Sequence, residues 1–152
     1  MAAQPNLHAV RFDLEVTIAR PVAAVFAYVT DVRNLPEWQD SAIEAEWIEP
    51  ERRFRERRSF LGRTAETELE VIAFEPERRF DVKAVKGPVK FEIHHSFAAD
   101  DGGTLLRVSA EAKTGGALRF AAAVAKSQVE RQFRSDLDRL KRVLEGSDPA
   151  GV

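Results

Sequence analysis

Cysteine is absent from the 152 residues, which excludes disulfides, thiolate metal sites and cysteine nucleophiles. An excess of positive charge is missing too. The 23 basic and 25 acidic residues leave a formal net charge of -2, whereas nucleic-acid binding calls for a strongly basic balance. The most apolar stretch, residues 117–125, is interrupted by Arg119 and is far shorter than the roughly 20 residues of a transmembrane helix. We therefore expect no nucleic-acid partner and no membrane span.

Targeting and catalytic motifs are also missing. The start of the chain has neither the basic residues nor the apolar run of a signal peptide, so we expect a cytoplasmic protein. There is no G-x-S-x-G elbow, G-x-G-x-x-G fingerprint or P-loop. His94 and His95 are adjacent and would point to opposite faces of a strand, so they do not form a metal pair. We expect no metal and no cofactor, and only weak catalytic candidates, His95 and Glu56, each acting alone as an acid or base.

The composition that is present fits one globular domain. Hydrophobic residues make up 44% of the chain and charged residues 32%. A chain of this length usually forms a single domain with a full core. We place that domain at residues 11–146, with loose tails at residues 1–10 and 147–152.

Seven segments alternate between apolar and polar residues with period two, which is typical of half-buried strands. Short turns rich in glycine and proline separate most of them, which favours an antiparallel meander. The alternating segments are Phe12–Ile18, Ile43–Ile48, Phe54–Phe60, Ala65–Val71, Phe80–Ala84, Val89–Phe97 and Leu106–Ala110.

Helical periodicity appears near both ends of the chain. A short apolar stripe follows Pro21, which suits the start of a helix, and residues 31–39 read as a short turn-rich or helical link. After Gly115 and Gly116, a stripe with steps of three or four continues to Leu144; roughly 28 residues would span about 42 Å. Its first half is rich in alanine, so we expect a mostly apolar pocket of about 300–1,000 Å³ beneath it. The stripe is Leu118, Ala122, Ala125, Val129, Phe133, Leu137, Leu140 and Leu144.

Three stretches carry a family resemblance: ARPVAAVFAYVTDVRNLPEW, RRFRERRSFLGR and GPVKFEIHHSFAADDGGTLLRV. With the order of elements, they resemble the START-like (SRPBCC) superfamily, in its polyketide cyclase/dehydrase-like branch, from about Phe12 to Leu144. The resemblance implies an α+β helix-grip fold, in which a curved seven-stranded antiparallel sheet wraps around the long C-terminal helix with two short helices. It also implies an apolar cavity between sheet and helix. Members bind lipids, sterols, polyketides or quinones, and some catalyse cyclisation or dehydration.

Ionisable residues on inward faces are the polar candidates for that cavity. Glu56 and Arg58 lie two apart on one strand face, and His95 lies on another. Burying them is costly unless they are paired or wet, so Glu56 and Arg58 either form a solvated salt bridge at the sheet rim or orient a ligand. His95 is either a satisfied core residue or a ligand contact, and Trp38 is either a core plug or an aromatic gate. The predicted ligand-binding residues are Trp38, Trp47, Phe54, Glu56, Arg58, Phe91, His95, Val108, Ala122 and Ala125.

A basic run, residues 52–58, precedes acidic residues at 66, 68 and 70. Pairing of Arg55 and Arg57 with these glutamates across the turn predicts a solvated sheet face rather than a phosphate- or membrane-binding patch.

Three functions remain open. The first is binding or carriage of a small apolar molecule that is lipid-, polyketide- or quinone-like. The second is a polyketide cyclase or dehydratase using the same cavity, and the third is an adaptor for a protein partner. We favour the first because no catalytic set is visible, and expect a monomer or homodimer.

Overall fold

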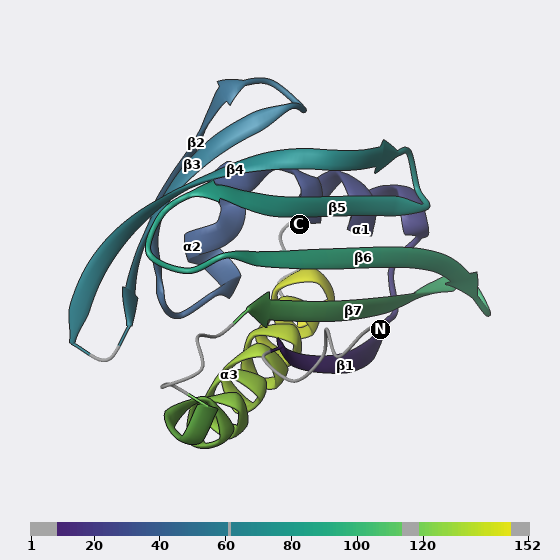
Figure 1. The fold of residues 1–152 in the computed structure, drawn as a ribbon. Coiled ribbons are helices and arrows are strands. Elements are labelled where there is room, and N and C mark those ends of the chain that lie inside the picture. Colours follow the sequence, from purple (N-terminus) through teal and green to yellow (C-terminus); the bar gives the residue numbers. More distant parts are fainter. Residues whose placement is uncertain (1–8, 61, 114–118, 147–152) are drawn as a thin grey trace, which may run out of the picture.

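The computed structural model describes residues 9–60, 62–113 and 119–146, and only the backbone of residues 9, 60, 113 and 119–125. Within these residues, seven strands and a long C-terminal helix dominate the fold (Figure 1). The strands are β1 (Ala9–Ile18), β2 (Ala42–Glu49), β3 (Arg53–Phe60), β4 (Arg63–Glu75), β5 (Arg79–Lys86), β6 (Phe91–Asp100) and β7 (Gly103–Lys113). The helices are α1 (Val22–Thr30), the 3₁₀ turn η2 (Val32–Asn34), α2 (Leu35–Trp38) and α3 (Arg119–Gly146).

The strands form an antiparallel sheet in the order β1-β7-β6-β5-β4-β3-β2. Consecutive strands from β2 to β7 are neighbours, and β1 pairs with β7 from Ala9 opposite Lys113 to Ile18 opposite Thr104. The sheet bends along the long strand β4, so that β2 and β3 run at a steep angle to β5, β6 and β7 (Figure 1). A register shift between Val71 and Ala73 lies in β4, where a bulge increases bending. The predicted α+β helix-grip fold is confirmed, and its first strand begins at Ala9, two residues before the predicted start of the domain at residue 11.

The two faces of the sheet differ as the alternation predicts. We call the face that carries Phe12 and Leu14 the inner face, because the ring of Phe12 packs edge-on against Phe133 of α3 at 5.1 Å. The opposite face is the outer face. In α3, the predicted stripe is buried at Leu137, Leu140 and Leu144, while Leu118 lies outside the described residues. Burial of this stripe holds α3 alongside β1 (Figure 1).

Polar contacts fix the last turns of α3. Lys141 donates to the carbonyl oxygen of Thr17 at 2.5 Å, and Arg20 donates to that of Leu144 at 2.8 Å. Within the described residues, no helix combines the length and the apolar character that crossing a membrane requires.

Two sequence expectations about inward positions are wrong. Ile43 is 42% exposed, because an irregular register between Ala42 and Glu44 turns Ala42 inward instead. Val89 is 48% exposed and precedes β6, which begins at Phe91. Pro88 lacks the N–H that a ladder needs, so the turn extends past it.

The turns use positive φ where strands reverse tightly. Glu51 has φ of 63° between β2 and β3, and this turn places Trp47 opposite Phe54 with their rings 5.6 Å apart. Asp101 and Gly102 have φ of 50° and 82°, which is typical of a two-residue hairpin turn. The predicted hairpin at residues 100–103 is therefore confirmed.

Candidate functional site

The inner face carries the predicted apolar residues. Phe54 and Val108 are fully buried in the core, each 3% exposed, whereas Trp47 and Phe91 are only half-buried. Other apolar side chains packed against the core are also partly open to solvent. Among them are Ile93, Val129 and Phe133. The face therefore presents apolar and aromatic surface that the described residues do not fully cover.

Arg58 is the centre of a polar network on the inner face. Its Nε donates to Glu56 Oε2 at 3.1 Å and its Nη2 to Glu56 Oε1 at 2.8 Å, so the predicted pairing exists and is bidentate. Nη1 also donates to Ser41 Oγ at 2.7 Å, and Nη2 to Gln39 Oε1 at 2.8 Å. Glu56 is 5% exposed, while the Arg58 side chain is 29% exposed. The network ties the segment after α2 to β3 and leaves one buried carboxylate neutralised by a half-buried guanidinium.

Asp136 is a buried acid that the sequence reasoning missed. It lies on α3 and is 6% exposed, and its Oδ1 accepts from Gln132 Nε2 at 2.9 Å and from the backbone N–H of Asp40 at 3.3 Å. Burial raises the pKa of Asp136 above 3.8, although these bonds and the charge of Arg58 oppose the shift. The available signal was its position three residues after Phe133, on the edge of the apolar stripe.

His95 is also buried, at 9% exposure. Its Nδ1 lies 2.7 Å from the carbonyl oxygen of Phe80, to which it can only donate, so Nε2 carries the lone pair of the neutral ring. The ring centroids of His95 and Phe80 lie 5.6 Å apart. Burial lowers the pKa of His95, partly opposed by the bond to Phe80 and the charge of Asp81. The arrangement gives a neutral imidazole with one satisfied nitrogen and one basic nitrogen.

Three remaining predicted residues differ in how far the structure describes them. Trp38 is 3% exposed and packs in the core, and its Nε1 is buried without a hydrogen-bond partner among the described residues. Its burial fits the core plug better than a gate. The side chains of Ala122 and Ala125 lie outside the described residues. The apolar pocket predicted beneath this half of α3 therefore stays a prediction.

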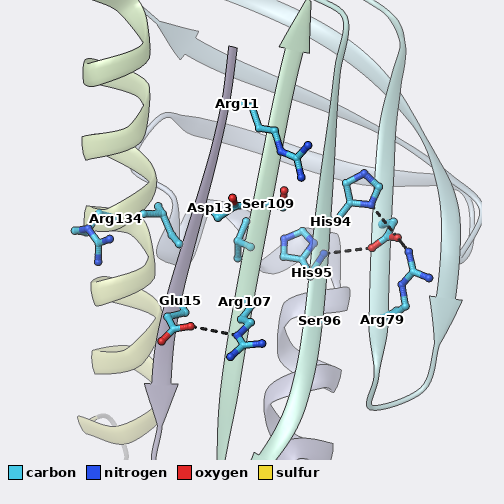
Figure 2. Close-up of a pocket in the computed structure, with 13 residues that line it drawn as sticks. Arg11, Asp13, Glu15, Arg79, His94, His95, Ser96, Arg107, Ser109 and Arg134 are labelled. Carbon is cyan, nitrogen blue, oxygen red and sulfur yellow. Dashed lines mark hydrogen bonds and ion pairs between the residues drawn. The ribbon is translucent and has the colours of Figure 1, made fainter. Parts of the chain in front are cut away.

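A pocket of about 550 Å³ lies on the outer face instead (Figure 2). The charged and hydroxyl side chains that its strands contribute alternate with buried inner residues, which places them on the face away from the core. Three inner-face residues, Leu14, His95 and Val108, line it as well. Arg134 of α3 borders it beside β1 (Figure 2). We call this the outer pocket, and its charged and hydroxyl side chains are Arg11, Asp13, Glu15, Arg79, Asp81, His94, Ser96, Arg107, Ser109 and Arg134.

Solved structures share this fold at low sequence identity. A START superfamily protein from Mycobacterium smegmatis has 17% identity and a TM-score of 0.72, covering 91% of this chain and 98% of its own. The Zhui aromatase/cyclase from Streptomyces sp. R1128 has 17% identity and a TM-score of 0.72, covering 92% and 99%. The di-domain aromatase/cyclase StfQ of the steffimycin biosynthetic pathway has 16% identity and a TM-score of 0.79, covering 97% of this chain and 54% of its own.

Sequence comparison gives the family. No curated protein matches the chain. The family model described as polyketide cyclase/dehydrase and lipid transport matches residues 9–145, which is nearly the whole described chain. The protein therefore belongs to the polyketide cyclase/dehydrase and lipid-transport family.

Proposed function

We propose that this protein binds or carries a small apolar molecule, lipid-, polyketide- or quinone-like, between the inner face of the sheet and α3. The observation that supports it is the set of half-buried apolar side chains on that face, led by Trp47, Phe91 and Ile93. Apolar ligand sites combine such a surface with a few fixed polar groups. Arg58 and Asp136 supply those groups at one end, and His95 supplies another on β6.

One half-buried isoleucine and one exposed isoleucine provide a test of the proposal and its control. Ile93 lies opposite Val82 and Ala110, both buried inward, so a larger side chain there would fill inner space. Ile72 of β4 is 43% exposed and is free to enlarge without entering that space. The pair therefore separates loss of ligand volume from a general effect of added aromatic surface.

The test is a titration with the neutral fluorescent probe N-phenyl-1-naphthylamine. We expect saturable binding to the parent, at least a tenfold weaker affinity in Ile93→Trp, and an unchanged affinity in the control Ile72→Trp. A tenfold change corresponds to about 1.4 kcal/mol, which loss of a few buried methylene contacts can supply. Absence of saturable binding to the parent, or equal affinity in both variants, would contradict the proposal. If the parent binds the probe, native mass spectrometry of the purified protein would identify a co-purified natural ligand by its mass.

A cyclase or dehydratase activity is the second candidate, favoured by one observation. Two ionisable groups lie on the same side of the sheet as Arg58. They are Asp136, a buried acid with a raised pKa, and His95, a neutral imidazole. Such groups can donate and accept protons in an apolar site. If His95 is the acid or base, His95→Gln should lower the turnover of a poly-β-ketone thioester about 10²–10⁴-fold. The affinity of the variant for that thioester should stay nearly the same as the parent's. If the protein only binds, the same change should weaken affinity up to about tenfold, and no turnover should be seen in the parent.

A further inference from the structure

The outer face of the sheet, over β2, β3, β4 and the end of β5, carries charges that neutralise one another. The predicted pairing is confirmed for Arg55 with Glu66 at 3.1 Å, whereas Arg57 pairs with Glu44 of β2 at 3.2 Å. Further pairs on this part of the face are Arg53 with Glu68, Arg55 with Glu46 and Lys86 with Glu68. An unpartnered polar atom in apolar surroundings lies on the inner face instead.

The imidazole of His95 is held in one orientation. His95 follows His94 of the outer face on β6, so its ring lies on the inner face. Its backbone N–H donates to Asp81 Oδ1 at 3.3 Å, and its Nδ1 donates to the carbonyl oxygen of Phe80 at 2.7 Å. The plane of the imidazole is tilted by 33° from the plane of the Phe80 ring. These contacts with β5 fix the position of the second ring nitrogen, Nε2, before any ligand binds.

Nε2 of His95 is a hydrogen-bond acceptor without a donor. The carbonyl oxygen of Phe80 can only accept, so the hydrogen is on Nδ1 and Nε2 carries the lone pair. Nε2 makes no hydrogen bond with any residue that the structure describes. Among those residues, the unpartnered side-chain nitrogen that is sealed from solvent is Trp38 Nε1. Since Nε2 also lacks a partner but is not sealed, it borders open space on the inner face.

Apolar residues surround this acceptor. Phe80 and Val108 stand opposite His95 on the two neighbouring strands, and both are buried. Along β6, Phe97 is buried on one side of His95, and Ile93 is half-buried on the other. Residues two apart on a strand lie on the same face, about 7 Å from each other. An apolar molecule that packs on Ile93 therefore comes within reach of Nε2.

Hydrogen-bond donors on the core side of the sheet are mostly engaged or sealed. Four of the five N–H groups of Arg58 already donate to neighbouring side chains. The N–H of Trp38 Nε1 is closed off in the core. A ligand carbonyl therefore meets few free donors, whereas a ligand hydroxyl can donate to His95 Nε2. A ligand that covers Nε2 without donating to it leaves a buried polar atom unpaired, which weakens binding.

We propose that His95 selects the ligand of the inner face by accepting, at Nε2, a hydrogen bond from a hydroxyl group of that ligand. The ligand class is then an apolar molecule with a phenolic or alcoholic hydroxyl, such as a hydroquinone. The corresponding ketone or quinone, which carries acceptors only, binds more weakly. This inference rests on the proposed function, because it concerns the polar group of the same ligand. Burial lowers the pKa of His95 from 6.5, which keeps the ring neutral at pH 7 and Nε2 an acceptor.

The experiment compares two naphthalene probes that differ in one hydrogen-bond donor. 2-Naphthol offers a hydroxyl group, whereas 2-methoxynaphthalene has a methyl group in place of the hydroxyl hydrogen and offers an acceptor alone. Both probes are neutral at pH 7, as the phenol of tyrosine is. In isothermal titration calorimetry, we expect the parent to bind 2-naphthol about tenfold more tightly, a factor that one hydrogen bond to an otherwise unpaired acceptor can supply.

Variants assign this preference to Nε2. His95→Asn can keep a side-chain N–H for the carbonyl oxygen of Phe80 but has no acceptor at the Nε2 position, so its affinities for the two probes should lie within about twofold of each other. His95→Gln has a longer side chain that can present an oxygen there, and should retain part of the preference. The matched control His94→Asn makes the same substitution on the outer face and should keep the parent's preference.

Imidazole ¹⁵N NMR of the parent gives a readout that needs no variant. In protein labelled at histidine, 2-naphthol should move the Nε2 resonance of His95 saturably toward that of a protonated nitrogen, and 2-methoxynaphthalene should not. Equal affinities of the parent for the two probes, or the parent's preference retained in His95→Asn, would overturn the proposal. Titration of the parent with N-phenyl-1-naphthylamine tests the inner face separately. If that probe binds saturably while the two naphthalenes bind equally, the role of His95 fails and the proposed function stands.

Discussion

Replacing Arg58 with methionine should lower the free energy of unfolding by about 3 kcal/mol, because it leaves the carboxylate of Glu56 charged and buried. Glu56 is 5% exposed, and both of its oxygens are bound by Arg58 at 3.1 and 2.8 Å. Removing one partner of a buried pair typically costs about 3–5 kcal/mol. We take the lower end because the Arg58 side chain is 29% exposed and water can reach part of the site.

Urea denaturation followed by circular dichroism measures this effect. With a denaturant slope of about 2 kcal/mol per M, a loss of 3 kcal/mol should lower the midpoint by about 1.5 M. Arg57→Met is the matched control, since Arg57 is the neighbouring residue, is 44% exposed and makes one 3.2 Å contact with exposed Glu44. This variant should change the stability by less than about 1 kcal/mol.

A double variant identifies the source of the loss. In Glu56→Gln with Arg58→Met, no charge remains buried, so the double variant should recover at least half of the stability lost in Arg58→Met alone. Two results would refute the reasoning: a midpoint for Arg58→Met equal to that of the Arg57 control, or a double variant no more stable than Arg58→Met. Either result would mean that the free energy cost of burying the Glu56 carboxylate does not depend on its pairing with Arg58.

Further predictions concern titration and packing. Because burial lowers the pKa of His95 from 6.5, the stability that the neutral ring contributes should be present above about pH 6.5 and fall as the pH drops toward the lowered pKa. In unfolding measurements, His95→Gln should therefore lose less stability than the parent as the pH is lowered. Since the pKa of Asp136 is raised from 3.8, its neutral form stabilises the fold at low pH and that stability falls as the pH rises through the raised pKa, so Asp136→Asn should gain stability relative to the parent between about pH 4 and 7. Leu140→Ala, at a fully buried position of α3, should lower the free energy of unfolding in urea by about 3–4 kcal/mol, and Phe133→Ala, at a half-buried position, by about 2 kcal/mol. Equal losses in the two variants would contradict this difference in packing along α3.

The sequence alone determined the order of elements and most of the inner face. Period-two alternation places every second residue of a strand on one side, so the pattern predicts Phe54 and Val108 on the inner face, where both are buried. The same rule predicted that Glu56 and Arg58, two residues apart on β3, would meet. These inferences succeeded because they depend on spacing within a single element, which backbone geometry fixes.

Only the tertiary structure decided which distant residues meet. Asp136 reaches the backbone of Asp40, 96 residues earlier, because α3 packs beside the segment that follows α2. The inward turn of Ala42 in place of Ile43 depends on an irregular register with β3, which no local pattern encodes. The outer pocket combines β1, β5, β6, β7 and Arg134 of α3, which become neighbours only because β1 pairs with β7 and α3 lies along β1. Spacing along the chain fixes which face a side chain takes, whereas strand pairing and helix packing fix what stands beside it.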